Sequence, residues 1–216
     1  MPDIFDEVEE DLRAERARKL AQRWGGVALG VALLALAASG GWQAWRWHEA
    51  RQAAAAADTY LTLHRSTERE GADLATAGNG FAALSRESTT GYRTLSRLRA
   101  AALKAETGDQ AGAQALWNAV AADTEADRLY RDLAILMAVT HALDSGDPAQ
   151  LAARIAPLTA EGNPWRASAR EAQGLIAMRR GANDEARRIM EALAADPAAP
   201  QGVRERAQRV AVGLRT

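Results

Sequence analysis

The sequence predicts an all-α fold in which a single N-terminal transmembrane helix is followed by a solenoid of helical hairpins. Residues 25–45 form a run of 21 residues without a charged side chain, which is long enough to cross a bilayer. Ala, Leu, Arg and Glu dominate the chain and aromatic residues make up only 5% of it, a composition that favours helix over strand. Glycine-centred turns then recur at spacings of 38 and 35 residues, which is typical of stacked helical units.

The first predicted segment is a cytoplasmic arm over residues 1–24. Ile4, Phe5, Val8 and Leu12 recur at helical spacing among acidic residues, and the arm then turns basic. Two interpretations stay open for this arm: a short amphipathic helix and a solvated tail.

The second predicted segment is a transmembrane helix over residues 25–45. At about 1.5 Å per residue the run covers roughly 31 Å, which is close to the thickness of the hydrocarbon core. Trp24 lies at one end and Trp42, Trp45 and Trp47 lie at the other, where indole rings favour the headgroup region. These four tryptophans are therefore the predicted membrane-interface residues.

Basic residues predict the orientation of this helix. Two of them, Arg46 and Arg51, follow the run closely, whereas five precede it: Arg13, Arg16, Arg18, Lys19 and Arg23. Because the more basic flank stays in the cytoplasm, we expect residues 46–216 to lie outside it.

Other interpretations of the same run remain. It can be a buried helix of a soluble core, or the apolar region of a cleavable signal peptide with Ala35-Leu36-Ala37 as the cleavage site. Gly26 and Gly30 have the spacing that allows close packing against a neighbouring helix, so they are candidate helix-packing residues.

The third predicted segment is a repeat domain over residues 46–216, built from a stalk helix, about three to four degenerate repeats and a C-terminal capping helix. Its predicted repeat turns are Gly108-Asp109, Gly146-Asp147 and Gly181. Glycine supplies the left-handed backbone at a helix end, and Asp can cap the next helix. Gly78, followed by Phe81 and Leu84, suggests an earlier and more degenerate unit.

Small or apolar residues recur five, nine and twelve positions after each of these glycines, so we expect them to form the core between units. They are Ala113, Leu151 and Ala186, then Trp117, Ile155 and Met190, then Val120, Leu158 and Leu193. A second tryptophan, Trp165, follows Asn163-Pro164 at a turn and is either a core residue or an exposed anchor for a peptide.

This pattern resembles tetratricopeptide repeats, whose unit is a helix-turn-helix of about 34 residues. The last unit is the most similar, because Gly174 occupies the usual helix-crossing position and Asp196-Pro197 closes the unit. The other units depart from the pattern, since Ala101 and Val139 replace the crossing glycine.

The sequence carries no pattern that indicates catalysis. It has no cysteine, and His48, His64 and His141 are too far apart in sequence to form a zinc-type motif. The net charge is −1 with both signs interspersed, which does not favour nucleic-acid binding. We therefore expect a non-enzyme without cofactor or metal.

The whole chain resembles the YfgM-like family of ancillary subunits of the bacterial SecYEG translocon. The similarity rests on the order of arm, uncharged run, Ala-rich stalk and degenerate repeats. It rests also on IFDEVEEDLRAERARKLAQRWG and NPWRASARE, which resemble alpha-proteobacterial members. The resemblance implies a single-pass inner-membrane protein with a periplasmic repeat domain. It also implies partners: the translocon, a periplasmic PpiD-like chaperone and nascent chains.

Two other functions fit the same pattern. One is a membrane-anchored scaffold for envelope assembly or cell division, and the other is a soluble periplasmic binding protein released by signal cleavage. The oligomeric state is not assigned by any sequence feature.

Overall fold

The computed structural model describes the backbone of residues 4–215 and the side chains of residues 18, 19, 22–24, 26, 27, 29–31 and 33–215. The chain divides into two compact units, Met1–Gln52 and Ala53–Thr216. The described elements are all helices.

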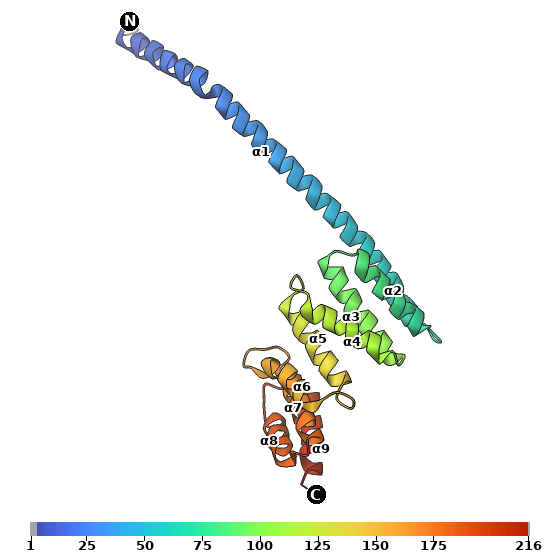
Figure 1. Ribbon diagram of the computed structural model, residues 1–216. Coiled ribbons are helices and arrows are strands. Elements are labelled where there is room, and N and C mark those ends of the chain that lie inside the picture. Colours follow the sequence, from blue (N-terminus) through green and yellow to red (C-terminus); the bar gives the residue numbers. More distant parts are fainter. Residues whose placement is uncertain (1–3, 216) are drawn as a thin grey trace. The chain divides into compact units, whose positions relative to one another are not determined.

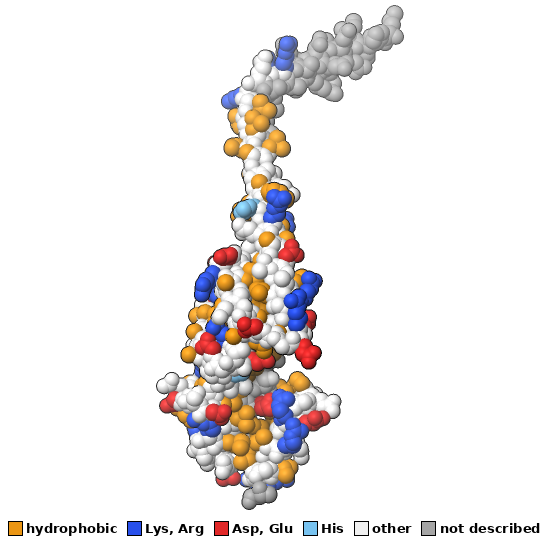
Figure 2. Space-filling view, turned by 90° about the vertical axis from the view of Figure 1, so that its right-hand side faces the viewer, with side chains coloured by type: hydrophobic (Ala, Val, Ile, Leu, Met, Phe, Trp, Pro, Cys, Tyr) orange, Lys and Arg blue, Asp and Glu red, His pale blue; other side chains and the backbone are white. Residues whose placement is uncertain are grey.

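Helix α1 covers Ile4–Thr67 and includes the whole first unit beyond residue 3. The side chains of Ile4, Phe5, Val8 and Leu12, on which the amphipathic interpretation of the arm depends, lie outside the described residues. Among the side chains of this unit that the structure describes, the large apolar ones are exposed, with Leu34 at 72% and Leu36 at 69%. Figure 2 shows such hydrophobic side chains at the surface of the narrow upper part of the chain.

The predicted transmembrane helix over residues 25–45 is wrong. Within the part of the chain that the structure describes, no helix combines the length and the hydropathy that a bilayer crossing requires. The physical reason lies in the kind of side chain rather than in charge. Eleven of the 21 residues in the run are Ala or Gly, and only six are Val or Leu. Small side chains add little apolar area, so an uncharged run is not necessarily a strongly apolar one.

The second unit contains the C-terminal end of α1 and a series of short helices (Figure 1). These are α2 (Leu74–Glu87), α3 (Thr90–Glu106), α4 (Gln110–Ala122), α5 (Arg128–His141), α6 (Pro148–Ile155), the 3₁₀ helix η1 (Ala156–Thr159), α7 (Arg166–Arg179), α8 (Asn183–Ala194) and α9 (Gln201–Gly213). From α2 to α9, each α-helix packs on the next, and α3, α5, α7 and α9 also contact one another in sequence. These four helices therefore form a continuous row, with α4, α6 and α8 behind it.

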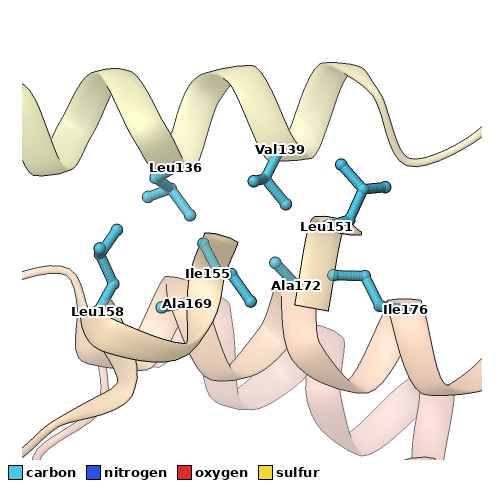
Figure 3. Close-up of a cluster of buried hydrophobic side chains, with 8 residues drawn as sticks. All are labelled: Leu136, Val139, Leu151, Ile155, Leu158, Ala169, Ala172 and Ile176. Atoms are coloured by element: carbon cyan, nitrogen blue, oxygen red, sulfur yellow. The ribbon is translucent and has the colours of Figure 1, made fainter. Parts of the chain in front are cut away.

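The core of the second unit lies between successive hairpins. The nine repeat positions that the sequence predicts as core are all buried, with exposed fractions between 0% and 7%. In the cluster shown in Figure 3, Leu136 and Val139 of α5 face Ile155 of α6 and Ile176 of α7. The spacing of small and apolar residues thus accounts for the burial of both faces of each hairpin.

The two tryptophans of the second unit differ in burial. Trp117 is 1% exposed and packs in the cluster that joins α3, α4 and α5. Trp165 is partly buried against the cluster of Figure 3, and its indole N–H donates to the carbonyl of Leu129 at 3.0 Å. Trp165 is therefore a boundary residue, and its polar edge is used within the fold.

Candidate functional site

Each predicted repeat turn joins the two helices of one hairpin: α3 and α4, α5 and α6, or α7 and α8. Gly108 has a φ of 88° and Gly181 a φ of 74°, both in the left-handed region that favours glycine. Asp109 caps α4 by accepting from the N–H of Gly112, and Asp147 caps α6 by accepting from those of Ala149 and Gln150. Each cap satisfies backbone donors that a helix end leaves open.

Gly146 serves a different purpose from the other two glycines. The φ of Gly146 is not positive. A Cβ there, however, would lie 3.0 Å from the carbonyl oxygen of Ala142 and 3.1 Å from a methyl of Leu151. This glycine is required by close packing rather than by backbone conformation.

A further turn of the same kind precedes α2 and was not predicted. Gly71 has a φ of 73°, and Asp73 caps α2 by accepting from the N–H and the hydroxyl of Thr76. Ala72 lies between Gly71 and Asp73, so the consecutive Gly-Asp pair of the other turns is absent from the sequence here. Gly78 lies inside α2, where a Cβ would be 3.3 Å from that of Leu103, so it marks a helix contact and not a turn.

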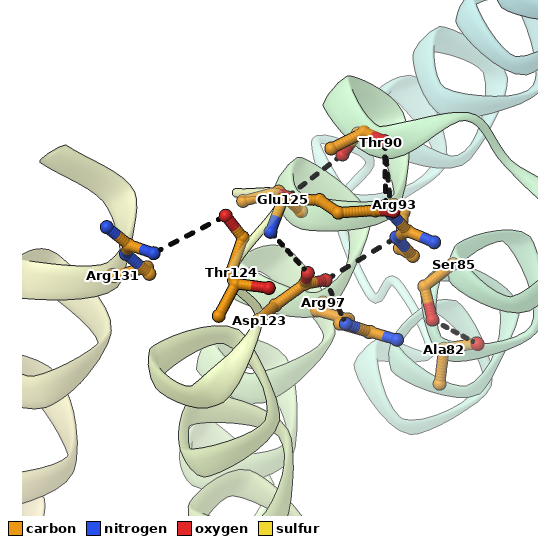
Figure 4. A network of polar contacts seen from close by, with 10 residues as sticks. Ala82, Ser85, Thr90, Arg93, Arg97, Asp123, Thr124, Glu125 and Arg131 are labelled. Carbon is orange, nitrogen blue, oxygen red and sulfur yellow. Dashed lines mark hydrogen bonds and ion pairs between the residues drawn. The ribbon is translucent and has the colours of Figure 1, made fainter. Parts of the chain in front are cut away.

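Half-buried carboxylates join the two helices of a hairpin at the end opposite the glycine turn, as Figure 4 shows for Asp123. Asp123 accepts from Arg97 at 2.9 Å through Oδ2, and its Oδ1 accepts from the N–H of Glu125. Asp196 repeats this arrangement with Arg166 at 2.9 Å and with the N–H of Ala198. The Ala198 N–H, followed by the Arg166 guanidinium, lowers the pKa of Asp196 below its ordinary value.

The hairpin of α5 and α6 has a contact between Asp132 and Asn163 in place of the Arg–Asp ion pair. Asn163 Nδ2 donates to Asp132 at 2.8 Å, and Asn163 Oδ1 accepts from the N–H of Trp165. The 3₁₀ helix η1 lies just before this turn, at the end of α6. In both kinds of hairpin a residue after the second helix contacts a side chain of the first helix and accepts from a backbone N–H two residues later. Only the side-chain pair changes, from Arg–Asp to Asp–Asn.

The row of helices α5, α7 and α9 carries an open groove of about 390 Å³. Most of its lining is apolar: Leu136, Met137, Leu143, Ala172 and Leu175. Thr140 and Ser168 add two small hydroxyl side chains, and the Thr140 hydroxyl donates to the carbonyl of Leu136 at 2.8 Å. The groove therefore presents mainly carbon atoms to an incoming chain.

One ion pair borders this groove. Glu171 of α7 accepts from Arg206 of α9 through both oxygens, at 2.6 and 2.7 Å. This side-chain contact with Glu171 raises the pKa of Arg206 above its ordinary value. A bidentate pair of this kind fixes the relative position of the two helices at the edge of the groove.

The predicted residues of the first unit are not brought into a common site. Trp24, Trp42, Trp45 and Trp47 are 58% to 60% exposed. The rings of Trp42 and Trp45 lie 5.7 Å apart, and Arg51 lies 4.3 Å above the ring of Trp47.

The two candidate helix-packing residues, Gly26 and Gly30, have open space around them. A Cβ at either position would meet no described atom within 4 Å.

The histidines and carboxylates do not converge either. His141 lies against Trp117 in a tilted arrangement with ring centroids 4.6 Å apart, and His64 stacks on Tyr60 at 6.4 Å. Among the described residues, no three His, Asp or Glu side chains are placed to hold a metal ion. The groove on α5, α7 and α9 is the candidate site, and its mainly apolar lining is suited to binding.

Comparison with known proteins gives one match. A family model described as a tetratricopeptide repeat-like domain matches residues 18–208. No curated protein and no solved structure gives a significant match.

Proposed function

Because the chain belongs to the tetratricopeptide repeat-like domain family, we propose that it is a protein-interaction scaffold whose groove on α5, α7 and α9 holds an apolar segment of a polypeptide. Stacked helical hairpins create extended surfaces that bind other proteins. The observation that carries the proposal is the apolar lining of this groove by side chains from two successive hairpins, those that begin with α5 and α7.

The lining determines which ligand suits the groove. Burying apolar side chains of a partner against Met137 and Leu175 removes carbon surface from water, at about 25 cal/mol per Å². Neither residue offers a hydrogen bond that would select one sequence, so recognition is expected to depend on apolar content. Unfolded polypeptides expose such segments, whereas folded proteins bury them.

The proposal also includes the source of the apolar segments that the groove would bind. The resemblance to YfgM-like proteins suggests emerging polypeptides beside a SecYEG-type translocon, together with a PpiD-like periplasmic chaperone. A location outside the cytoplasm stays a prediction of that resemblance. The apolar groove supports the choice of an unfolded client within this set of partners.

Photo-crosslinking in cells tests the proposal. A photoreactive amino acid replaces Thr140 or Ser168 in the groove, and Ala153, exposed on α6, is the matched control position. We expect adducts with unfolded secretory polypeptides from the two groove positions and not from Ala153. Adducts with division or envelope-assembly proteins alone would contradict the translocon part. Equal adducts from all three positions would contradict the groove.

A binding measurement provides the second test. Thr140→Arg places a charged side chain in the groove without opening the core, because Thr140 is exposed. Since desolvating the new charge is unfavourable, we expect the affinity for a carboxymethylated, permanently unfolded model protein to fall roughly tenfold. Ala153→Arg adds the same charge on α6 and should leave the affinity unchanged in the same anisotropy titration.

A further inference from the structure

The two ends of the repeat domain carry opposite charge. Residues 166–216 contain ten arginines and six carboxylates, whereas residues 53–165 contain ten basic and fourteen acidic residues. Charges of both signs are mixed over the face shown in Figure 2.

Several of these arginines already have a carboxylate partner. Arg166 pairs with Asp196, Arg206 with Glu171 and Arg215 with Glu191. Two more pairs lie at the start of α8, Arg180 with Glu185 and Arg187 with Asp184, at 3.0 and 3.1 Å.

Arg170 and Arg188 differ from this set. Within the described residues, neither lies at ion-pair distance from a carboxylate, although the charge of Arg170 contributes to the lowered pKa of Asp196. Arg188 donates only to the backbone carbonyl of Asp184, at 3.3 Å.

Both arginines line one open cleft between α7 and α8. This cleft has a volume of about 350 Å³ and shares no lining residue with the groove on α5, α7 and α9. Its only carboxylate, Glu185, is held by Arg180. The unpaired charge at the cleft is thus that of two guanidinium groups.

The rest of the cleft is not charged. Ile189 and Ala192 of α8 supply apolar contact surface, and Gln173 of α7 supplies an amide that can both donate and accept. Two cations beside an apolar surface suit a segment with carboxylates on one side and apolar residues on the other.

We propose that this cleft is a second docking surface, which binds an acidic amphipathic segment of a protein partner through Arg170 and Arg188. A planar guanidinium pairs with a carboxylate through two parallel hydrogen bonds, so each arginine can hold one acidic side chain. A protein segment fits better than a nucleic acid, because the apolar surface of Ile189 and Ala192 beside the arginines can be covered by apolar side chains but not by a phosphate backbone.

The test compares two double variants of the full chain. Arg170→Glu with Arg188→Glu reverses both charges at the cleft. The matched control, Arg69→Glu with Arg86→Glu, makes the same change in net charge at two exposed positions away from it. Circular dichroism confirms that each variant is folded, and Arg170→Gln with Arg188→Gln provides a milder alternative if the reversal impairs folding.

The probe is a short fluorescent peptide of Glu and Leu residues, titrated by anisotropy at two salt concentrations. We expect the cleft variant to bind it roughly tenfold more weakly, the control to bind it as wild type does, and wild-type binding to weaken with salt. Equal losses in both double variants would contradict the proposal, since only net charge would then matter. If a single-stranded oligonucleotide bound the wild-type chain more tightly than the peptide does, the cleft would instead be a nucleic-acid-binding surface. Thr140→Arg should still bind the acidic peptide, which separates this proposal from that for the groove.

Discussion

Asp196 divides its two carboxylate oxygens between a backbone turn and an arginine of the neighbouring helix. Oδ1 accepts from the N–H of Ala198 and Oδ2 from Arg166, and Asp123 uses its oxygens in the same way. One side chain thereby closes a turn and joins the first helix of a hairpin to the end of the second. Both contacts are stronger when the carboxylate is ionised, because the acceptor then carries a charge.

Replacing Asp196 by Asn should therefore change how stability depends on pH. The folded-state pKa of Asp196 is lowered from the ordinary 3.8, so its contribution is present above 3.8 and is lost as the pH falls through the folded-state value. We expect Asp196→Asn to melt below wild type at neutral pH and the difference to shrink below pH 3.8. Thermal melts across pH measure this.

Asp144→Asn is the matched control, because Asp144 is exposed in the loop after α5. It makes the same Asp-to-Asn change at an exposed position and should melt close to wild type at neutral pH. A difference for Asp196→Asn that stays constant with pH would show that its carboxylate is not stabilised by its charge.

At the scale of helices, the approach of α7 to α8 depends on a missing side chain. A Cβ at Gly174 would lie 2.6 Å from the terminal methyl and 3.2 Å from the sulfur of Met190. Met190 is fully buried, so it has little room to move away. Gly174 thus lies at a close contact between α7 and α8.

Gly174→Val should lower the free energy of unfolding by about 1–3 kcal/mol, because the added carbons overpack this crossing. Combining it with Met190→Ala removes the atoms that the new side chain would meet. The double variant should therefore lose less stability than the sum of the two single variants, as measured by urea denaturation. Additive losses would mean that the two residues do not limit each other.

The sequence predicts these elements well where local chemistry and repetition agree. Gly108 and Asp109 specify a turn by backbone conformation and capping, and the buried positions follow at fixed offsets. The turn at Gly71 was missed because Ala72 interrupts the pattern. The groove was missed because its lining comes from three helices whose mutual packing determines which faces stay open. The membrane span was wrong because lack of charge was equated with high hydropathy.

At the scale of the whole molecule, the four buried clusters found among the described residues lie within the second unit. Their residues run from Tyr60 in the last turns of α1 to Ala211 in α9. Each cluster joins neighbouring helices, so stability is expected to be roughly the sum of contacts between neighbours.

A fragment of residues 53–216 should therefore fold without the first unit. We expect its far-ultraviolet circular dichroism to be helical and its melting temperature to match that of the full chain, since no described cluster residue is removed. A fragment that is unfolded, or that melts much earlier, would show that residues 1–52 contribute to the stability of the repeats.

The distribution of tryptophan gives this domain two optical probes. Of the six tryptophans in the chain, only Trp117 and Trp165 lie beyond residue 52. The first is enclosed between α3 and α5, and the second sits at the boundary of the cluster between α5 and α7. In the fragment of residues 53–216, replacing either by Phe leaves a single tryptophan in a known layer of the stack. Fluorescence can then show whether neighbouring layers melt together or one after the other.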